Sequence, residues 1–497
     1  MTDADHNPGR YVYDVAGVQA IDRAAIHEAG IPGYELMTRA AGYALDVALA
    51  EFPGSDSWVV LCGGGNNAGD GYALARLAAR RGLDVSVRHV SDPDRLTGAA
   101  ATAWRDCVAA GVPIGAFDGA LPGAAGLLVD GLLGSGLARD VAGQYAAAVA
   151  AVNDHPAPVL ALDIPTGVHG DTGKVLGSAV RADVTVTFVG QKLGLYLAGG
   201  PDACGRLVFH DLDIPASCYD AATPVLRRIG MADVASALPP RHRQAHKGDF
   251  GHVVIVGGAP GMPGAVRLAG EAALRCGAGR VSIATHPQHA GALPAGRPEL
   301  MCHAVTEPAE LAALLQTATV VALGPGLGRD EWSRRLFAAA RDVQLPSVVD
   351  ADGLNLLAEA PDSRADRVLT PHPGEAGRLL GCTARAVQAD RRGALDDLIG
   401  RYGGAVVLKG CASLVGVAAK MPWLSTAGNP GMATAGTGDV LTGVVAALLA
   451  QGLDAELAAV VGVAVHARAG DVAAQSGGER GLLASDLLAE LRPWVNP

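Results

Sequence analysis

Residues 428–443 read Gly-Asn-Pro-Gly-Met-Ala-Thr-Ala-Gly-Thr-Gly-Asp-Val-Leu-Thr-Gly, and an apolar run at 444–450 follows them. The apolar run predicts a helix. A glycine-rich turn that leads into a helix N-terminus presents free backbone N–H groups at the positive end of the helix dipole, where they can bind an anion. Asp439 stands at the mouth of this site. A helix cap would explain an aspartate there, but a cap does not require Gly436 and Gly438. We therefore interpret the stretch as an active-site loop for proton transfer or for chemistry on a metal-bound phosphate.

Length and composition predict a multidomain α/β protein. At 497 residues the chain is too long for one ordinary domain, and we expect two or three. Hydrophobic residues make up 49% of the chain but aromatic residues only 4%, so the cores must be built from Ala, Val and Leu. The net charge is −11, and no block of Lys and Arg stands out, which argues against nucleic acid as a partner.

The sequence shows no sign of export or of a membrane span. Residues 1–10 are polar and lack the apolar segment of a signal peptide. The most apolar stretch, 444–467, is interrupted by Gln451, Asp454 and Glu456, so we do not expect it to cross a membrane. The eight cysteines have no metal-ligand spacing. We expect reduced, mostly buried thiols in a cytoplasmic protein.

The first half begins with a unit typical of nucleotide-binding sheets. We expect a helix over 21–51, a buried strand over 57–61, a glycine-rich turn over 62–71, a helix over 72–81 and a strand over 85–90. The glycines of the turn do not follow the dinucleotide fingerprint GxGxxG. Its amide and carboxylate side chains, Asn66, Asn67 and Asp70, can coordinate a hard cation or hold ribose and phosphate oxygens. A plain Asn/Gly turn is the alternative.

Two more strands of the first half end in a carboxylate. The strand that starts at residue 127 ends at Asp130 and a Gly/Ser loop, and the strand that starts at residue 159 ends at Asp163, with Thr166 just beyond. Loops that follow the carboxyl ends of parallel strands converge on one crevice. We therefore expect Asn67, Asp130, Asp163 and Thr166 to be neighbours in space.

The second half starts a new sheet after a Pro-containing segment, and we place the domain boundary at 220–228. Strands are expected over 252–256, 280–285, 319–323, 347–350 and 405–408, with a helix over 265–276. The loops that follow these strands are polar or rich in glycine, and the 428–443 stretch comes last. Two α/β sandwiches in tandem are predicted, without a sequence repeat between them.

The motifs of the second half resemble those of the ribokinase-like superfamily, whose signature Gly-Thr-Gly-Asp stands at 436–439. A closer resemblance is to the ADP-dependent NAD(P)H-hydrate dehydratases, through Lys247-Gly, 324–328, 350–355, 370–375, Lys409-Gly and 428–432. The first half resembles the NAD(P)H-hydrate epimerase domain, through 63–71, 129–134 and 163–167. Together the halves resemble the bifunctional NAD(P)H-hydrate repair enzymes. The resemblance implies a Rossmann-like epimerase domain at 10–222 and a ribokinase-like dehydratase domain at 228–495.

The resemblance also implies roles in the epimerase half. Asp163 would bind substrate and act as the acid/base. Potassium would be held by Asn67, Asp130 and Thr166, where the family usually has Ser in place of Thr. The other residues implied to bind substrate lie in the two loops, and they are Asn66, Asn67, Ala68, Gly69, Asp70, Gly134, Ser135, Gly136, Leu137, Ala138, Arg139 and Asp140.

In the dehydratase half the implied catalytic residue is Asp439, which would act at the substrate hydroxyl. Ala265, Gly326 and His372 would line the substrate site with it. The nucleotide would be bound by Lys409, Gly410, Cys411, Ala412, Ser413 and Gly438. We interpret Asp350, Asp352 and Asn355 as strand-end caps.

The implied substrates are both epimers of hydrated NADH and NADPH (NADHX and NADPHX). The implied cofactors are K⁺, ADP as phosphoryl donor with ATP as a substitute, and Mg²⁺. We expect a homo-oligomer that binds no nucleic acid and no membrane.

Two alternatives remain open at this point. One is a small-molecule kinase of the hydroxymethylpyrimidine or hydroxyethylthiazole type, fused to a nucleotide-binding domain. The 324–328 and 370–375 loops argue against it, because they match the dehydratase set. The other is a nucleotide sensor without activity, against which the presence of both Asp163 and Asp439 argues.

Overall fold

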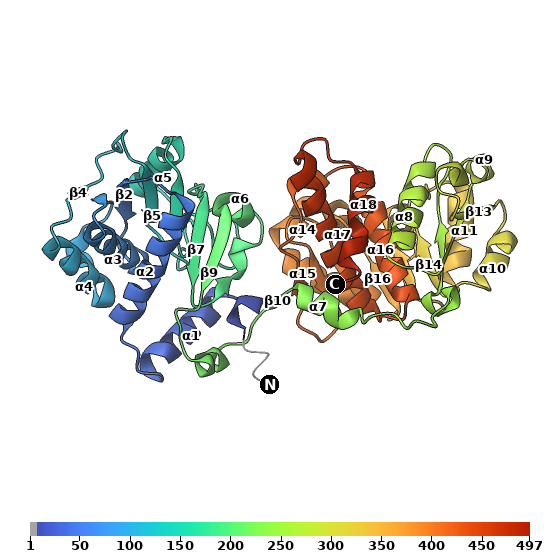
Figure 1. Cartoon of the computed structure of the whole chain (residues 1–497), viewed down its shortest axis with the longest axis horizontal. Helices are drawn as coiled ribbons and strands as arrows, with labels where there is room; N and C mark the ends of the chain where they lie inside the picture. The colour runs from blue at the N-terminus through green and yellow to red at the C-terminus, as the bar shows by residue number, and fades with distance from the viewer. Residues whose placement is uncertain (1–6) are drawn as a thin grey trace. The chain divides into compact units, whose positions relative to one another are not determined.

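The chain divides into two compact units, Met1–Leu226 and Arg227–Pro497, and the computed structural model describes residues 7–497 of it (Figure 1). Most of the polar stretch 1–10 that we examined for a signal peptide therefore lies outside the described residues. Each unit has its own sheet, parallel in the first unit and mostly parallel in the second, and its own hydrophobic core.

The sheet of the first unit is parallel throughout, in the order β4-β3-β2-β5-β6-β7-β9. Its strands are β2 (Ser57–Cys62), β3 (Asp84–His89), β4 (Ile114–Ala116), β5 (Leu127–Gly131), β6 (Val159–Leu162), β7 (Val184–Phe188) and β9 (Arg206–His210). The chain runs outward from β2 to β4 and then returns to β5 on the other side of β2. The crevice at the carboxyl ends of β2 and β5 is thus the switch point where parallel sheets bind ligands.

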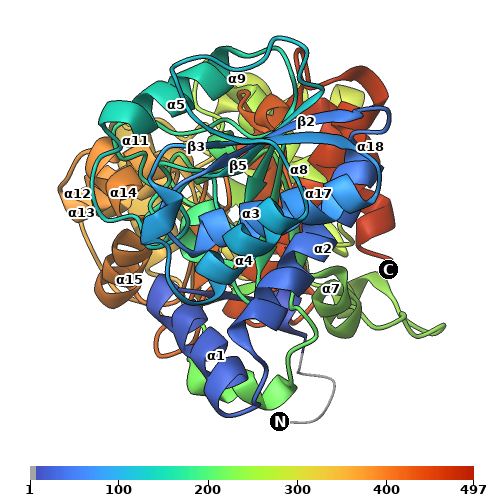
Figure 2. The same cartoon turned by 90° about the vertical axis from the view of Figure 1, so that its left-hand side faces the viewer.

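Helices cover both faces of this sheet, as a parallel sheet requires. Figure 2 shows α2 (Gly33–Glu51), α3 (Asn66–Arg80) and α4 (Gly98–Ala109) on one side of the strands and α5 (Gly143–Asp154) on the other. The first unit also contains α1 (Val15–His27), the short α6 (Gly200–Cys204) and a small parallel pair, β1 (Tyr11–Tyr13) with β8 (Gln191–Lys192).

Two helix predictions in this unit were wrong, one in the number of helices and one in the residue where the helix begins. The expected single helix over 21–51 is two helices, α1 and α2, because Gly30 adopts a left-handed φ of 71° and Pro32 has no N–H to continue a helix. The helix expected from residue 72 begins instead at Asn66. Asn66, Asn67 and Asp70 therefore belong to the first turns of α3, where unpaired helix N–H groups lie.

The second unit has a larger sheet, in the order β13-β12-β11-β14-β15-β16-β17-β18-β19-β10. It is parallel from β13 to β17, and β18 is antiparallel to both of its neighbours. The strands are β10 (Leu226–Arg228), β11 (His252–Val256), β12 (Arg280–Thr285), β13 (Met301–Ala304), β14 (Val320–Leu323), β15 (Ser347–Val349), β16 (Arg367–Leu369), β17 (Ala405–Leu408), β18 (Leu414–Gly416) and β19 (Trp423–Leu424). The order reverses between β11 and β14, which creates a second switch point.

Helix α16 (Thr437–Ala450) lies in the core of this unit, packed against α8 (Pro263–Arg275), α17 (Ala455–Gly477) and α18 (Ala484–Trp494). A Cβ on Gly443 would come within 2.0 Å of the Ala269 carbonyl oxygen, so glycine at this position lets α16 and α8 approach closely. The remaining helices are α7 (Met231–Ala237), α9 (Pro287–Ala290), α10 (Pro308–Leu315), α11 (Glu331–Arg341), α12 (Ala351–Glu359), α13 (Pro373–Leu380), α14 (Ala384–Ala389) and α15 (Arg391–Tyr402).

Helix α17 is, by length and composition alone, apolar enough to cross a membrane, and 61% of its most apolar window is buried inside the protein. The core helix of a folded domain passes the same test. All eight cysteines lie within residues 7–497, and each of them is a free thiol, as the sequence predicts.

Candidate active sites

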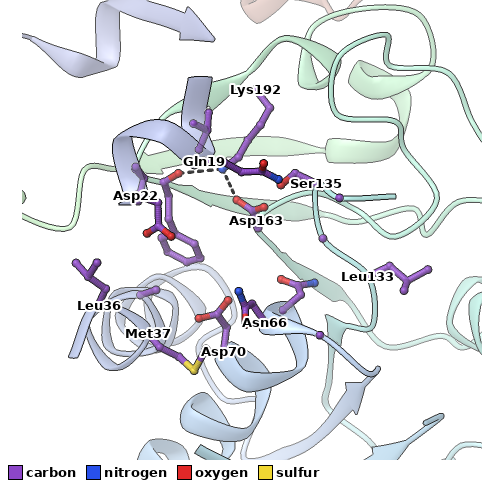
Figure 3. A pocket seen from close by; sticks show the side chains of 18 of the residues that line it. Gln19, Asp22, Leu36, Met37, Asn66, Asp70, Leu133, Ser135, Asp163 and Lys192 are labelled. Atoms are coloured by element: carbon purple, nitrogen blue, oxygen red, sulfur yellow. Dashed lines mark hydrogen bonds and ion pairs between the residues drawn. The ribbon is translucent and has the colours of Figure 1, made fainter. Parts of the chain in front are cut away.

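A cavity of about 690 Å³ lies in the first unit, at the switch point between β2 and β5. Asn66, Asn67 and Asp70 reach it from α3, and Asp163 reaches it from the end of β6 (Figure 3). The loop after β5 contributes predicted substrate-binding residues, which are Gly134, Ser135, Gly136, Leu137, Ala138 and Arg139. The structure thus brings most of the predicted epimerase residues together around one cavity.

Three predicted residues do not line this cavity. Ala68 is fully buried in α3. Gly69 packs against α2 and α4, since a Cβ on it would come within 2.6 Å of Met37 Cε and 2.8 Å of Ala100 Cα. Asp140 is exposed at the end of the β5 loop. Their places in the fold are consistent with packing and loop roles.

Asp130 and Thr166 lie beneath the cavity and are hydrogen-bonded to each other. The Thr166 amide donates to Asp130 Oδ2 (2.8 Å), and the Thr166 hydroxyl donates to Asp130 Oδ1 (2.7 Å). The Leu132 amide donates to Asp130 Oδ1, and the Leu133 amide donates to the Thr166 hydroxyl. These bonds attach the β5 loop to the pair. Burial raises the pKa of Asp130 to about 6, although the hydrogen bonds from Thr166 and Leu132 oppose the shift.

The side chain of Asn67 is buried at the start of α3, and its Nδ2 and Oδ1 have no hydrogen-bond partner in the part of the chain that the structure describes. A Cβ on Gly134 would lie 3.4 Å from Asn67 Cβ and 3.7 Å from Asp163 Oδ2. Gly134 of the β5 loop is therefore close to both side chains. Buried polar groups almost always have a partner. The unpartnered amide therefore points to a ligand.

Asp163 has a left-handed backbone, with φ of 66°, and its carboxylate is paired with Lys192 of β8. Asp22 of α1 also lines the cavity. Burial, the largest cause, raises the pKa of Asp22, and it raises the pKa of Asp70 well above its ordinary value, an effect that the charge of Asp163 increases. Sequence reasoning missed Lys192 and Asp22. The one available signal was a lysine within the apolar segment 184–198.

In the second unit Asp439 lies in the first turn of α16, whose N-cap is Gly436 with φ of 95°. The helix begins at Thr437, about two turns before the apolar run at 444–450 that predicts it, so Asp439 is not the N-cap. Burial raises the pKa of Asp439 to about 7, with a further rise from the charge of Asp350 and an opposing effect of Lys409. A carboxyl group with such a pKa can accept and release a proton near neutral pH.

A buried charge network lies against this turn. Lys409 Nζ is 2.8 Å from Asp350 Oδ1 and 3.8 Å from Glu375 Oε2, and the Thr442 hydroxyl donates to Asp350 Oδ2 (2.8 Å). A Cβ on Gly438 would come within 3.2 Å of Lys409 Nζ, so the helix turn and the ammonium are in close contact. Asp350 stands at the N-cap position of α12, as predicted, but its carboxylate makes no capping hydrogen bond there and binds Lys409 and Thr442 instead.

The predicted nucleotide loop, 409–413, is exposed at its tip and anchored at its base. Arg391 of α15 donates to the carbonyl oxygens of Leu408 (3.1 Å), Lys409 (3.3 Å) and Ala412 (3.3 Å). Gly410 and Cys411 at the tip are exposed, and Ala412 and Ser413 are half-buried. A fixed base with a free tip suits a loop that contacts a ligand through its backbone.

Ala265 and Gly326 face each other at the second switch point. A Cβ on Gly326 would come within 3.0 Å of Ala265 Cβ and 2.9 Å of Met262 Cβ. His372 is the N-cap of α13: its Nδ1 accepts from the Gly374 amide (2.9 Å), and its own amide donates to Glu375 Oε2 (2.8 Å). Burial and the charge of Lys409 lower the pKa of His372, so the ring is neutral at neutral pH, and its Nε2 lies 3.4 Å from Glu375 Oε1.

Sequence reasoning also missed His466 of α17. This buried ring donates from Nε2 to the Thr437 carbonyl oxygen (2.9 Å), in the first turn of α16. Burial lowers its pKa to about 4, so it stays neutral and supports the turn that carries Asp439.

Comparison with known proteins places both units in families. The model described as YjeF-related protein N-terminus matches residues 33–194, and the model described as NAD(P)H-hydrate dehydratase matches residues 253–493. Among solved structures, an ADP/ATP-dependent NAD(P)H-hydrate dehydratase from Bacillus subtilis, co-crystallised with ATP/Mg²⁺, is similar with a TM-score of 0.50 and 27% identity, over 55% of this chain and 98% of its own. A ribokinase-like superfamily protein from Enterococcus faecalis gives a TM-score of 0.51 at 27% identity, over 55% and 95% of the two chains. The predicted ribokinase-like fold of the second unit is confirmed.

Curated relatives match over nearly the full chain. The bifunctional NAD(P)H-hydrate repair enzyme Nnr of Coxiella burnetii is 46% identical, over 98% of this chain and 99% of its own length. The enzyme of the same name from Escherichia coli is 41% identical, over 96% and 92% of the two chains. The chain therefore belongs to the family of bifunctional NAD(P)H-hydrate repair enzymes.

Proposed function

We propose that this chain repairs hydrated nicotinamide cofactors in two steps, one in each unit. The first unit interconverts the R and S epimers of NADHX and NADPHX, and the second dehydrates the S epimer to NADH or NADPH at the expense of a nucleotide. The observation that carries the proposal is that each unit presents its own carboxylate, Asp163 or Asp439, at a ligand-binding edge of its own sheet.

The second site suits dehydration through phosphorylation. Hydroxide is a poor leaving group, whereas phosphate leaves readily as the double bond of the ring forms again. Asp439 would take the proton of the substrate hydroxyl as that oxygen attacks the terminal phosphorus of the nucleotide. The N–H groups of the α16 turn and the ammonium of Lys409, which lie together, would stabilise the charge on the transferring group.

We assign the binding roles in this unit as the resemblance implies. The substrate site is lined by Ala265, Gly326 and His372 together with Asp439. The close approach of Ala265 to Gly326 at the switch point supports this role. The nucleotide is bound by Lys409, Gly410, Cys411, Ala412, Ser413 and Gly438. The anchoring of the 409–413 loop by Arg391 supports this role. The Bacillus subtilis relative is described as ADP/ATP-dependent and was crystallised with ATP/Mg²⁺. We propose ADP as the donor here, with ATP as a substitute, and Mg²⁺ on the nucleotide phosphates.

In the first unit we propose Asp163 as the acid/base and the residues of α3 and the β5 loop as the substrate-binding set. Potassium would be held by Asn67, Asp130 and Thr166. All three offer side-chain oxygens, which hard cations prefer. A cation there would give the unpartnered Asn67 amide a ligand and would balance the buried charge of Asp130. Threonine keeps the hydroxyl that serine supplies elsewhere in the family.

The remaining expectations stay as proposals. We propose domain limits of 10–222 and 228–495. The free thiols suit a reducing compartment and support a cytoplasmic location. We also retain the expectation of a homo-oligomer.

The function is tested with a mixture of both NADHX epimers, ADP, Mg²⁺ and K⁺, by following the return of dihydronicotinamide absorbance. We expect full recovery, with one nucleotide consumed for each molecule repaired. When tetramethylammonium replaces K⁺, we expect the S epimer still to be repaired and the R epimer to persist. No recovery with either ADP or ATP would contradict the proposal and favour a small-molecule kinase.

The dehydratase rate should depend on pH through Asp439. Since a base must be ionised and burial raises the pKa of Asp439 to about 7, kcat/KM should fall as the pH drops below about 7. Replacing Glu375 by Gln removes a negative charge that raises this pKa, so the acid limb should move to lower pH. An acid limb that stays in place in Glu375→Gln would exclude Asp439 as the titrating base.

A further inference from the structure

Lys192 is a buried ammonium at the wall of the first-unit cavity. It lies on β8, with its residue only 1% exposed, and Figure 3 shows its side chain reaching Asp163. A lysine is seldom buried to this degree unless it is paired, because the charge must leave water. The implied roles of the epimerase half do not include it.

All three N–H donors of this ammonium are in use. Its Nζ donates to Asp163 Oδ1, to the Thr187 hydroxyl (3.1 Å) and to the Phe188 carbonyl oxygen (2.9 Å). An ammonium has three donors and no acceptor. No donor of Lys192 remains for a substrate, so whatever it contributes to the reaction must pass through Asp163.

The bond from Lys192 fixes one carboxylate oxygen of Asp163, and the other oxygen faces the β5 loop. Oδ1 is held by Lys192, and Oδ2 is the oxygen that a Cβ on Gly134 would approach to 3.7 Å. Gly134 belongs to the loop implied to embrace the substrate. The orientation of the carboxylate is therefore set by a buried, fully bonded partner on a neighbouring strand.

Of the carboxylates that line the cavity, Asp163 differs from the others in being paired with Lys192. Asp22 faces the same space from α1 and Asp70 from α3, and the charged groups that act on Asp22 are Lys192, Asp163 and Arg23. The structure shows a direct ion pair with Lys192 for Asp163, and shows none for the other two within the described residues.

We propose that Lys192 is a positioning residue of the epimerase, which holds Asp163 turned toward the substrate by binding one of its two oxygens. This inference rests on the proposed epimerase function of the first unit. It adds a residue to that site and gives Asp163 a fixed orientation through a direct ion pair with Lys192.

Lys192→Met tests the proposal in the full chain, with epimer exchange followed by chromatography of separated R- and S-NADHX. Misplacement of a catalytic group costs about 10²-fold in rate, so we expect kcat to fall by on the order of 10²-fold while KM changes little. Lys174→Met, at an exposed loop position, is the matched control and should behave as the wild type.

Thr187→Val is a second variant that keeps the charge and removes only one anchor of the ammonium. It should lower kcat less than Lys192→Met does and leave KM unchanged. Circular dichroism and thermal unfolding, compared with the wild type, show for every variant whether the first unit is folded, since activity of the second unit reports only on that unit.

Three outcomes decide the matter. An unchanged kcat in a folded Lys192→Met chain would overturn the positioning role alone. A raised KM with unchanged kcat would show that Lys192 binds substrate, which also overturns it. A wild-type chain without any exchange would overturn the proposed epimerase function, and the role of Lys192 with it.

Discussion

Asp439→Asn should abolish nucleotide-dependent dehydration while epimer exchange continues at the wild-type rate. General-base catalysis contributes about 10²–10⁴-fold, so we expect kcat for dehydration to fall by that factor. Asparagine keeps the size of the side chain at the first turn of α16 but cannot accept the hydroxyl proton. The measurement is the initial rate of NADH formation from purified S-NADHX with saturating ADP, next to exchange measured in the same sample.

Glu331→Gln provides the matched control. It makes the same change of charge in the first turn of another helix of the second unit, α11, at an exposed position. We expect both activities to be retained. If Asp439→Asn stopped dehydration and exchange together in a folded chain, the assignment of one site to each unit would be wrong.

Asp163→Asn should have the converse effect. Epimer exchange should fall by about 10²–10⁴-fold, because the amide cannot serve as a base. From a mixture of epimers, NADH should then form only from the S share, and the R share should persist. Asparagine is the informative replacement here, since it is one of the few residues that tolerate a left-handed backbone.

Asp213→Asn is the control for this variant, because Asp213 also has a positive φ, of 52°, and is exposed outside the cavity. We expect it to leave exchange unchanged. Full recovery of a mixed sample by Asp163→Asn at the wild-type rate would remove Asp163 from the mechanism.

The sequence predicts the framework of both sites because buried parallel strands are short apolar runs and because ligands gather at their carboxyl ends. That argument alone places Asn67, Asp130, Asp163 and Thr166 together, and the structure has them around the β5 loop. The resemblance adds the roles of these residues and the two-unit fold, which the comparisons confirm.

The sequence does not predict where some helices begin or which charged side chains form buried ion pairs. The first turns of α3 and α16 are rich in Gly, Asn and Thr, so they look like turns although they are helical. Residues that act through a partner distant in sequence, such as Lys192 with Asp163 or Asp350 with Lys409, have no local pattern. Short strands such as β16, with three residues, are too brief for a periodic signal.

The left-handed backbone of Asp163 has a consequence for how this chain can change over evolutionary time. A non-glycine residue in that conformation costs about 1–2 kcal/mol, and glycine at position 163 would avoid this cost. Glycine would also leave the buried ammonium of Lys192 without its carboxylate, and removing one partner of a buried ion pair costs about 3–5 kcal/mol. Selection for folding therefore retains the aspartate as long as the lysine is present, even in a lineage that no longer needs the epimerase. In such a lineage position 163 would drift only together with position 192 or after it.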